Sequence, residues 1–188
     1  MVDMSDTTGT TGVRPALKRL SAAIAWAEAR FAGLVILVIL CLLLTNVVSR
    51  AMGVPLIWTD ELAIYLIAVA AFAGASLGLR NRQHIAVTLL QDALPDTQRY
   101  RMTVAVDVVL LAIFGFLAWM LWTWFDPVNA FTADSLKAYS RASFNFIYQE
   151  PTTTLGIRKV WFWLILPVFC ITGLIHVLST FAEEKEPI

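Results

Sequence analysis

Four long apolar runs divide the chain and constrain its fold more than any other feature. They cover Phe31–Val48, Leu62–Leu79, Met102–Phe125 and Val160–Phe181. A helix that rises about 1.5 Å per residue needs roughly 20 residues to cross a hydrocarbon layer about 30 Å thick, and each run has about that length. With 59% hydrophobic residues and a mean hydropathy of +0.71, a chain of 188 residues is too short to enclose such runs in a soluble core. The sequence therefore predicts an all-α integral membrane protein with four transmembrane helices.

The segments between these runs predict one membrane domain over residues 14–182. Apolar residues at helical spacing predict amphipathic interfacial helices over about 14–30 and 84–95, lying at the membrane surface. The spans are expected at about 31–49, 61–79, 102–125 and 160–181, with an outer loop over 126–159. Polar composition predicts a disordered tail over 1–13, and residues 183–188 are expected to form a short C-terminal tail.

The first apolar run is expected to stay in the protein and not to be cleaved as a signal. Glu28 and Arg30 precede it directly, and it continues beyond the length of a signal core toward Thr45 and Arg50.

Basic residues predict the orientation in the membrane. Nine of them fall on the side of the two termini and five on the other side, which favours both termini in the cytoplasm. Tryptophan agrees with an interfacial outer face, because Trp58, Trp119, Trp122, Trp124, Trp161 and Trp163 fall at or near the expected outer helix ends.

Composition and motifs argue against several function classes. Fourteen basic residues balance fourteen acidic ones and no glycine-rich phosphate loop is present, so nucleic acid and nucleotides are not expected partners. Cys41 and Cys170 both lie in apolar runs and are interpreted as inert packing residues. No nucleophile with a base and no metal cluster is apparent, so neither an enzyme nor a cofactor or metal site is predicted.

Two kinds of ionisable residue could nevertheless carry chemistry. His84 and His176 both fall toward the cytoplasmic side, where a bis-histidine haem would make the chain a membrane anchor of a redox enzyme. Against this, His84 lies in a polar turn and an isolated His176 is more often a hydrogen-bonded packing residue. Asp107 is the one acidic residue well inside a span, where structural pairing is favoured over a role in transport.

Charged residues also meet at the expected outer turn. Thr59, Asp60 and Glu61 open the second span, where acidic groups complement the helix terminus. Arg50 closes the first span across nine residues, so it could pair with Glu61 or Asp60. We hypothesise the Arg50–Glu61 pair, against the alternative that Glu61 only complements the helix and Arg50 reaches water or a larger subunit.

Small residues and one proline mark the second and fourth spans. Ala70, Gly74 and Gly78 recur every four residues, a spacing that lets another helix approach closely, either in this chain or in another subunit. Pro167 lacks a backbone donor and is expected to kink the fourth span. With no polar pathway apparent, such a chain is expected to hold or complete something larger.

Four stretches resemble, in order, the small membrane subunit of tripartite ATP-independent periplasmic (TRAP) transporters of the DctQ type. They are TNVVSRAMGVPLIWTDELAIYL, FAGASLGLRNRQHIAVTLL, LPDTQRY and TTTLGIRKVWFWLILPV, and the resemblance covers about residues 25–180. Its most specific positions are Arg50, Trp58, Glu61, Gly74, Arg80, His84, Ile85, Leu155, Gly156 and Pro167.

This resemblance implies a bacterial inner-membrane protein that joins a much larger membrane subunit. In the family the larger subunit binds the solute and is driven by a sodium gradient, while a separate periplasmic receptor delivers the solute. The small subunit would then be a rigid scaffold in contact with membrane lipid. Two rival functions remain, namely the redox membrane anchor and a stand-alone homo-oligomeric transporter.

Overall fold

The computed structural model describes residues 13–81 and 95–183, and all of its elements are helices. The long ones are α1 (Val13–Ala51), α2 (Ile57–Arg80), α4 (Asp96–Phe125) and α8 (Ile165–Glu183), with α7 (Val160–Trp163) directly before α8. Two short helices, α5 (Pro127–Thr132) and α6 (Leu136–Ser143), follow α4. Four segments are long and apolar enough to cross a membrane, namely Pro15–Ala51, Ile57–Arg80, Gln98–Thr132 and Val160–Phe181. The prediction of an all-α protein with four membrane-spanning helices is confirmed.

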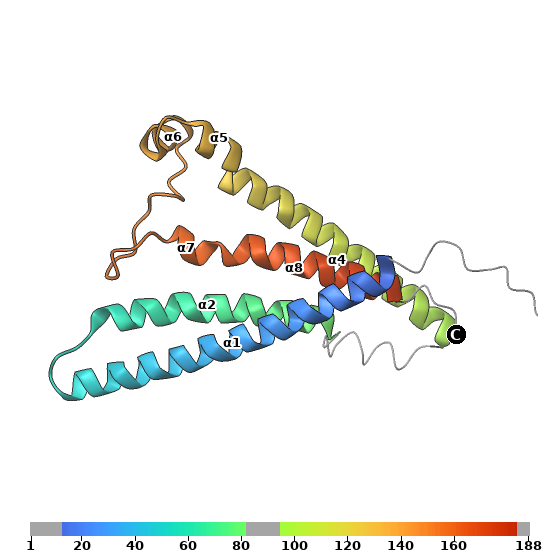
Figure 1. Ribbon diagram of the computed structural model, residues 1–188, viewed down its shortest axis with the longest axis horizontal. Coiled ribbons are helices and arrows are strands. Elements are labelled where there is room, and N and C mark those ends of the chain that lie inside the picture. The colour runs from blue at the N-terminus through green and yellow to red at the C-terminus, as the bar shows by residue number, and fades with distance from the viewer. Residues whose placement is uncertain (1–12, 82–94, 184–188) are drawn as a thin grey trace, which may run out of the picture.

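The helices form an open arrangement around α8 (Figure 1). α1 and α2 run side by side, and α8 contacts α1, α2 and α4. α4 diverges from the other helices toward the end that carries α5, α6 and the α1–α2 turn, which we call the turn end. At the opposite end α1, α4 and α8 lie closer together.

Aromatic side chains fill the contacts that α8 makes. The ring of Phe169 on α8 lies 5.3 Å from Phe72 on α2 and 5.4 Å from Phe114 on α4, measured between centroids. Nearer the turn end, Tyr65 on α2 stacks on Phe162 at 4.4 Å. α8 is therefore the element that joins the α1–α2 pair to α4.

The structure differs in detail from the expected boundaries. Residues 14–30 and the first span form one continuous helix, α1, whose 39 residues extend about 58 Å, well beyond a hydrocarbon layer of about 30 Å. That residues 14–30 lie at the membrane surface stays a prediction. The expected loop 126–159 contains the two short helices α5 and α6. The expected interfacial helix 84–95, with His84 and Ile85, lies outside the described residues except for Pro95.

Pro167 lies one turn after a break in the fourth span. The helix is interrupted at Leu164, between α7 and α8. Proline at position 167 cannot donate a hydrogen bond to the carbonyl of Trp163, which weakens the helix at this point.

Candidate functional site

Arg50 pairs with Asp60 at the turn end, and not with Glu61. The Arg50 Nη2 donates to Asp60 Oδ2 at 2.6 Å, and its Nε donates to Asn46 Oδ1 at 2.9 Å. The Asn46 Nδ2 in turn donates to the other carboxylate oxygen of Asp60. The Arg50–Glu61 hypothesis is therefore wrong. Because the side chains of Arg50 and Asp60 are 58% and 42% exposed, water screens this pair.

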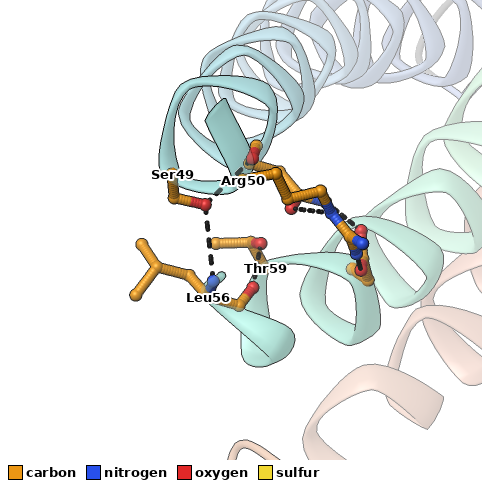
Figure 2. A network of polar contacts seen from close by, with 6 residues as sticks. Ser49, Arg50, Leu56 and Thr59 are labelled. Carbon is orange, nitrogen blue, oxygen red and sulfur yellow. Dashed lines mark hydrogen bonds and ion pairs between the residues drawn. The ribbon is translucent and has the colours of Figure 1, made fainter. Parts of the chain in front are cut away.

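Hydroxyl groups order the turn between α1 and α2, as Figure 2 shows. The Ser49 Oγ donates to the Asn46 carbonyl at 2.9 Å and accepts from the Leu56 backbone N–H at 3.4 Å. The Thr59 Oγ1 donates to the Leu56 carbonyl at 2.5 Å. Gly53 has φ +75°, a conformation that side chains disfavour. The turn is thus fixed by local bonds.

Glu61 binds a different segment, the loop that precedes α7. Its carboxylate accepts from the backbone N–H groups of Thr153 at 2.7 Å, Thr154 at 2.6 Å and Leu155 at 3.3 Å, and from the Thr154 hydroxyl at 2.5 Å. Glu61 therefore ties the start of α2 to a loop more than 90 residues away. Trp58, which the family resemblance also singles out, is 40% exposed one turn earlier on α2.

The loop itself is a short hairpin. Pro151 and Arg158 form an isolated antiparallel bridge, and Gly156 has φ +70°. The Lys159 Nζ donates to Glu150 Oε1 at 2.5 Å, and this carboxylate raises the pKa of Lys159 above its usual value. We call residues 150–159 the hairpin.

The segment after α4 caps that helix. The Asn145 Nδ2 donates to the carbonyl of Trp124 at 2.7 Å and the Tyr148 hydroxyl donates to that of Phe125 at 2.6 Å, so both satisfy carbonyls at a helix end. The Tyr139 hydroxyl donates to Asp126 at 3.2 Å, and burial raises the pKa values of Tyr139 and Tyr148. These bonds hold α5 and α6 against the end of α4.

A second group of polar side chains lies between α1, α2 and α8, away from the turn end. We call it the buried cluster, and its members are Ser21, Glu28, Ser76, Arg80, Thr172 and His176. Each of α1, α2 and α8 contributes two of them. Sequence reasoning singled out only Arg80 and His176 and did not bring them together.

His176 is the centre of this cluster. Its side chain is fully buried, with Nδ1 2.8 Å from Ser21 Oγ and Nε2 3.1 Å from Glu28 Oε2. Both ring nitrogens have hydrogen-bond partners, as expected for a packing residue. A haem ligand would need one ring nitrogen free to bind iron. The structure therefore disfavours the redox-anchor reading at His176, while His84 lies outside the described residues.

Ser76 and Arg80 extend the cluster along α2. The Ser76 Oγ lies 2.7 Å from Glu28 Oε1 and 3.0 Å from Thr172 Oγ1, so it touches both α1 and α8. The Arg80 Nη1 donates to Ser21 Oγ at 2.6 Å. Hydrogen bonds between side chains thus link α1, α2 and α8.

Asp107 lies on α4 and is only 4% exposed. It has a polar or electrostatic partner, as the favoured interpretation of structural pairing requires. A groove of about 390 Å³ among α1, α2, α7 and α8 is lined mainly by apolar side chains, and Glu28, Ser76 and Thr172 of the buried cluster also line it.

The small residues of α2 do not face a close neighbour within the described chain. A Cβ atom added at Gly74 or Gly78 would meet nothing within 4 Å, and Ala70 is half-buried. In contrast, a Cβ at Gly173 on α8 would overlap the ring of Phe114 on α4. Close packing within this chain therefore depends on Gly173, which sequence reasoning missed, and leaves the face of Gly74 and Gly78 open.

Comparison with known proteins places these features in a family. The chain is 24% identical over 114 residues to the sialic acid TRAP transporter small permease protein SiaQ of Vibrio cholerae serotype O1, covering 61% of this chain and 55% of that protein. It is 26% identical over 141 residues to the sialic acid TRAP transporter permease protein SiaT of Haemophilus influenzae, covering 74% of this chain and 20% of that protein. No solved structure matches.

The chain thus spans about half the length of the first relative and a fifth of the second. The family of tripartite ATP-independent periplasmic transporters, DctQ component, matches residues 39–185. This match includes α2, α4, α8 and the turn end, and its proteins are transport proteins, not enzymes. The chain belongs to the DctQ component family of TRAP transporters.

Proposed function

We propose that this chain is the scaffold for a larger membrane subunit that carries the solute. The match to SiaT carries the argument, because three quarters of this chain aligns with only a fifth of that permease. The rest of SiaT lies outside the matched region, and the larger subunit that we propose would supply the corresponding part. In the bacterial inner membrane the complex would take up solute with a periplasmic receptor and a sodium gradient.

The described contacts suit a rigid scaffold. The buried cluster joins α1, α2 and α8, while Phe114 and Phe169 join α8 to α4. Arg50 and Asp60 pair at the turn end, and the mainly apolar groove among α1, α2 and α8 borders the buried cluster. These contacts support a fixed body beside a moving subunit. The excess of basic residues on the side of the two termini supports an orientation with both termini in the cytoplasm and the turn end outside.

We also propose that the larger subunit packs on the open face of Ala70, Gly74 and Gly78. Small residues allow close helix approach in lipid, and no part of the described chain comes near the two glycines. Arg50, Trp58, Glu61, Arg80 and Pro167 would then act by shaping the scaffold, since Arg50, Glu61 and Arg80 form contacts within it.

Co-purification tests both proposals. Tagged protein expressed with its genomic neighbours should recover a larger membrane subunit in mild detergent and support uptake, with sialic acid as the first solute tested. Gly74→Leu should lose the larger subunit, whereas Gly115→Leu, at an equally open glycine on α4, should retain it. Recovery of only a monomer or homo-oligomer with transport intact would contradict the scaffold function. Equal behaviour of the two variants would contradict only the chosen face.

A further inference from the structure

Arg30 and Trp26 form an exposed pair on α1, one turn apart. The Arg30 guanidinium lies 4.2 Å from the centre of the Trp26 ring, and Trp26 is 61% exposed. A contact between a cation and an aromatic face is attractive, but it leaves the N–H groups of the guanidinium free to donate. Arg30 forms no hydrogen bond or ion pair with the described residues. We call these two residues the arginine–tryptophan pair.

The arginine–tryptophan pair lies on the side of α1 that faces away from the other helices. Trp26 and Arg30 are each two residues from Glu28, which corresponds to about 200° around a helix. Glu28 points inward, where it bonds to Ser76 on α2 and to His176 on α8. Glu28 is also the only acidic residue of α1. The positive charge of Arg30 therefore has no carboxylate on its own face of the helix.

The contacts of Glu28 place Arg30 within the membrane-spanning part of the fold. Ser76, a partner of Glu28, lies four residues or about 6 Å before the end of α2. Arg30 lies two residues beyond Glu28 toward the turn end, so its backbone is deeper in the span than the end of α2. Leu37 and Leu44 follow on the same face at intervals of seven residues, and they are 55% and 58% exposed. This face of α1 thus changes from charged and aromatic to apolar just after Arg30.

The direction of the Arg30 side chain fits this depth. Side chains on a helix lean toward its N-terminus, and the Arg30 guanidinium lies over Trp26, one turn nearer the N-terminus of α1. That end of α1 is the one opposite the turn end (Figure 1). A long cationic side chain attached within the hydrocarbon layer extends in this way to the polar surface. The guanidinium and the indole N–H therefore reach the height of the lipid phosphate groups.

From this geometry we propose that the arginine–tryptophan pair binds the phosphate of an anionic phospholipid. A guanidinium matches a phosphate with two parallel N–H···O bonds, and the Trp26 indole N–H supplies a third donor. The acyl chains of the same lipid would lie along the apolar face of Leu37 and Leu44. Because no carboxylate offsets Arg30 on its face, a headgroup with net negative charge is favoured over a zwitterionic one. This inference goes beyond the proposed function.

The larger subunit is the alternative occupant of this face, and the packing of α1 on α2 disfavours it. Ser76 points toward α1 and α8, where it bonds to Glu28 and Thr172. Gly74, on the face proposed for the larger subunit, is two residues from Ser76 and so points away from α1. Arg30 in turn points away from α2. A subunit that packs on Gly74 thus leaves the arginine–tryptophan pair in contact with lipid.

Lipid titration followed by native mass spectrometry tests the inference. Phosphatidylglycerol and phosphatidylcholine are titrated in turn onto the delipidated protein, purified with any subunit that accompanies it. The wild type should bind phosphatidylglycerol more tightly than phosphatidylcholine. Arg30→Gln should weaken phosphatidylglycerol binding about fivefold, as expected for one basic group at a membrane surface. Arg30→Lys should weaken it less, because the charge remains and only the paired donors are lost.

Two further variants separate this pair from a general effect of charge. Trp26→Ala should also weaken phosphatidylglycerol binding, because it removes the ring that positions Arg30 and the indole donor. Arg101→Gln is the matched control, since it removes an exposed arginine from α4 at the same end of the protein. This control should bind phosphatidylglycerol as the wild type does.

Several results would overturn the inference. Unchanged phosphatidylglycerol binding by Arg30→Gln would show that the pair holds no lipid. An equal loss in Arg101→Gln would show only a general attraction of anionic lipids to this end of the protein, and equal binding of both lipids would remove the anionic preference. Loss of the larger subunit in Arg30→Gln would show that this face packs on protein. A wild-type chain without a larger subunit contradicts the proposed function instead, and the titration then tests the chain alone.

Discussion

The two polar regions of this protein use similar residue types in opposite surroundings. In the buried cluster, Glu28 bonds to both Ser76 and His176, which joins three helices with little exposure to water. At the turn end, Arg50 and Asp60 pair in the open, and Glu61 binds mostly backbone amides of one loop. The first region therefore fixes how helices pack, whereas the second fixes the position of connecting segments.

Solvent exposure decides how much each contact contributes. A buried polar group that loses its partner keeps the full cost of desolvation, about 1–3 kcal/mol. An exposed group that loses its partner is solvated by water instead, and its loss is small. The five changes that follow test this difference, beginning with the largest expected effect.

Truncation of the Glu28–His176 pair should be the most damaging change. Either Glu28→Ala or His176→Ala leaves the other group buried, so each should lower the free energy of unfolding by about 2 kcal/mol. The double variant should lose less than the sum, because no unpaired group then remains. Unfolding of the detergent-solubilised protein measures all three.

The control for this cycle lies one turn away on the same helix. Among the described residues, the Thr180 hydroxyl bonds to carbonyls of α8 itself, at 3.2 Å to His176 and 2.9 Å to Val177, so Thr180→Ala should change stability little. Strictly additive losses at Glu28 and His176 would show that the pair is not coupled.

Two buried serines allow a comparison at the level of one hydroxyl group. Ser76 bonds to Glu28 and Thr172, whereas the Ser140 hydroxyl on α6 is fully buried with no partner among the described residues. Ser76→Ala should destabilise by about 1 kcal/mol, and Ser140→Ala should be neutral or stabilising, because it removes a buried polar group without a bond. Thermal unfolding of both variants measures the two effects. Equal losses of stability would contradict the expected difference between a bonded and an unbonded buried hydroxyl.

The sequence predicted the spans because each is one continuous apolar run. The contacts between spans were harder to predict from the sequence. Glu28 and His176 are 148 residues apart, so their pairing depends on how α1 crosses α8. A signal was nevertheless present in the spacing, because Ser76 and Arg80 lie four residues apart, as do Thr172 and His176. Each pair lies on one helix face, and two such faces indicate a polar helix contact.

The turn end shows why the Arg50 partner was misassigned. Asp60 and Glu61 are neighbours in sequence but point about 100° apart on a helix, so only one of them can face α1. Asn46, one turn before Arg50, bonds to both Arg50 and Asp60 and selects that face. Glu61 found its partners in a loop whose position no local pattern revealed.

Glu61→Gln should loosen the hairpin without loosening the helices. The neutral amide is a weaker acceptor for the N–H groups of Thr153 and Thr154, and charge-assisted hydrogen bonds are the stronger kind. Hydrogen exchange followed by mass spectrometry should show faster exchange over 152–155, with the α8 amides unchanged. Slower or equal exchange in the hairpin would contradict the tie.

The Arg50–Asp60 pair should contribute less than about 1 kcal/mol and should fade with salt. A double-mutant cycle of Arg50→Ala and Asp60→Ala, read by unfolding at low and high salt, measures the coupling. Asn46→Ala should lower stability more than either of these variants, because the Asn46 side chain is only 7% exposed, whereas those of Arg50 and Asp60 are largely solvated. A coupling energy above about 1 kcal/mol that does not change with salt would show that water does not screen the pair, as in the buried cluster.

The smallest effect is expected at Lys159, whose pKa is raised because its ammonium donates to Glu150. The folded pKa exceeds the unfolded value, so the stabilisation is complete below the ordinary lysine pKa of about 10.4 and is lost as pH rises through the folded value. Carbon-13 NMR of methylated lysines in nanodiscs can follow this titration, with Lys159→Arg assigning the signal. Glu150→Gln should move the Lys159 midpoint down toward its ordinary value while the buried cluster keeps the helices folded. An unchanged midpoint would show that the hairpin ion pair exists too briefly to matter, and the hairpin would then depend on Glu61 alone.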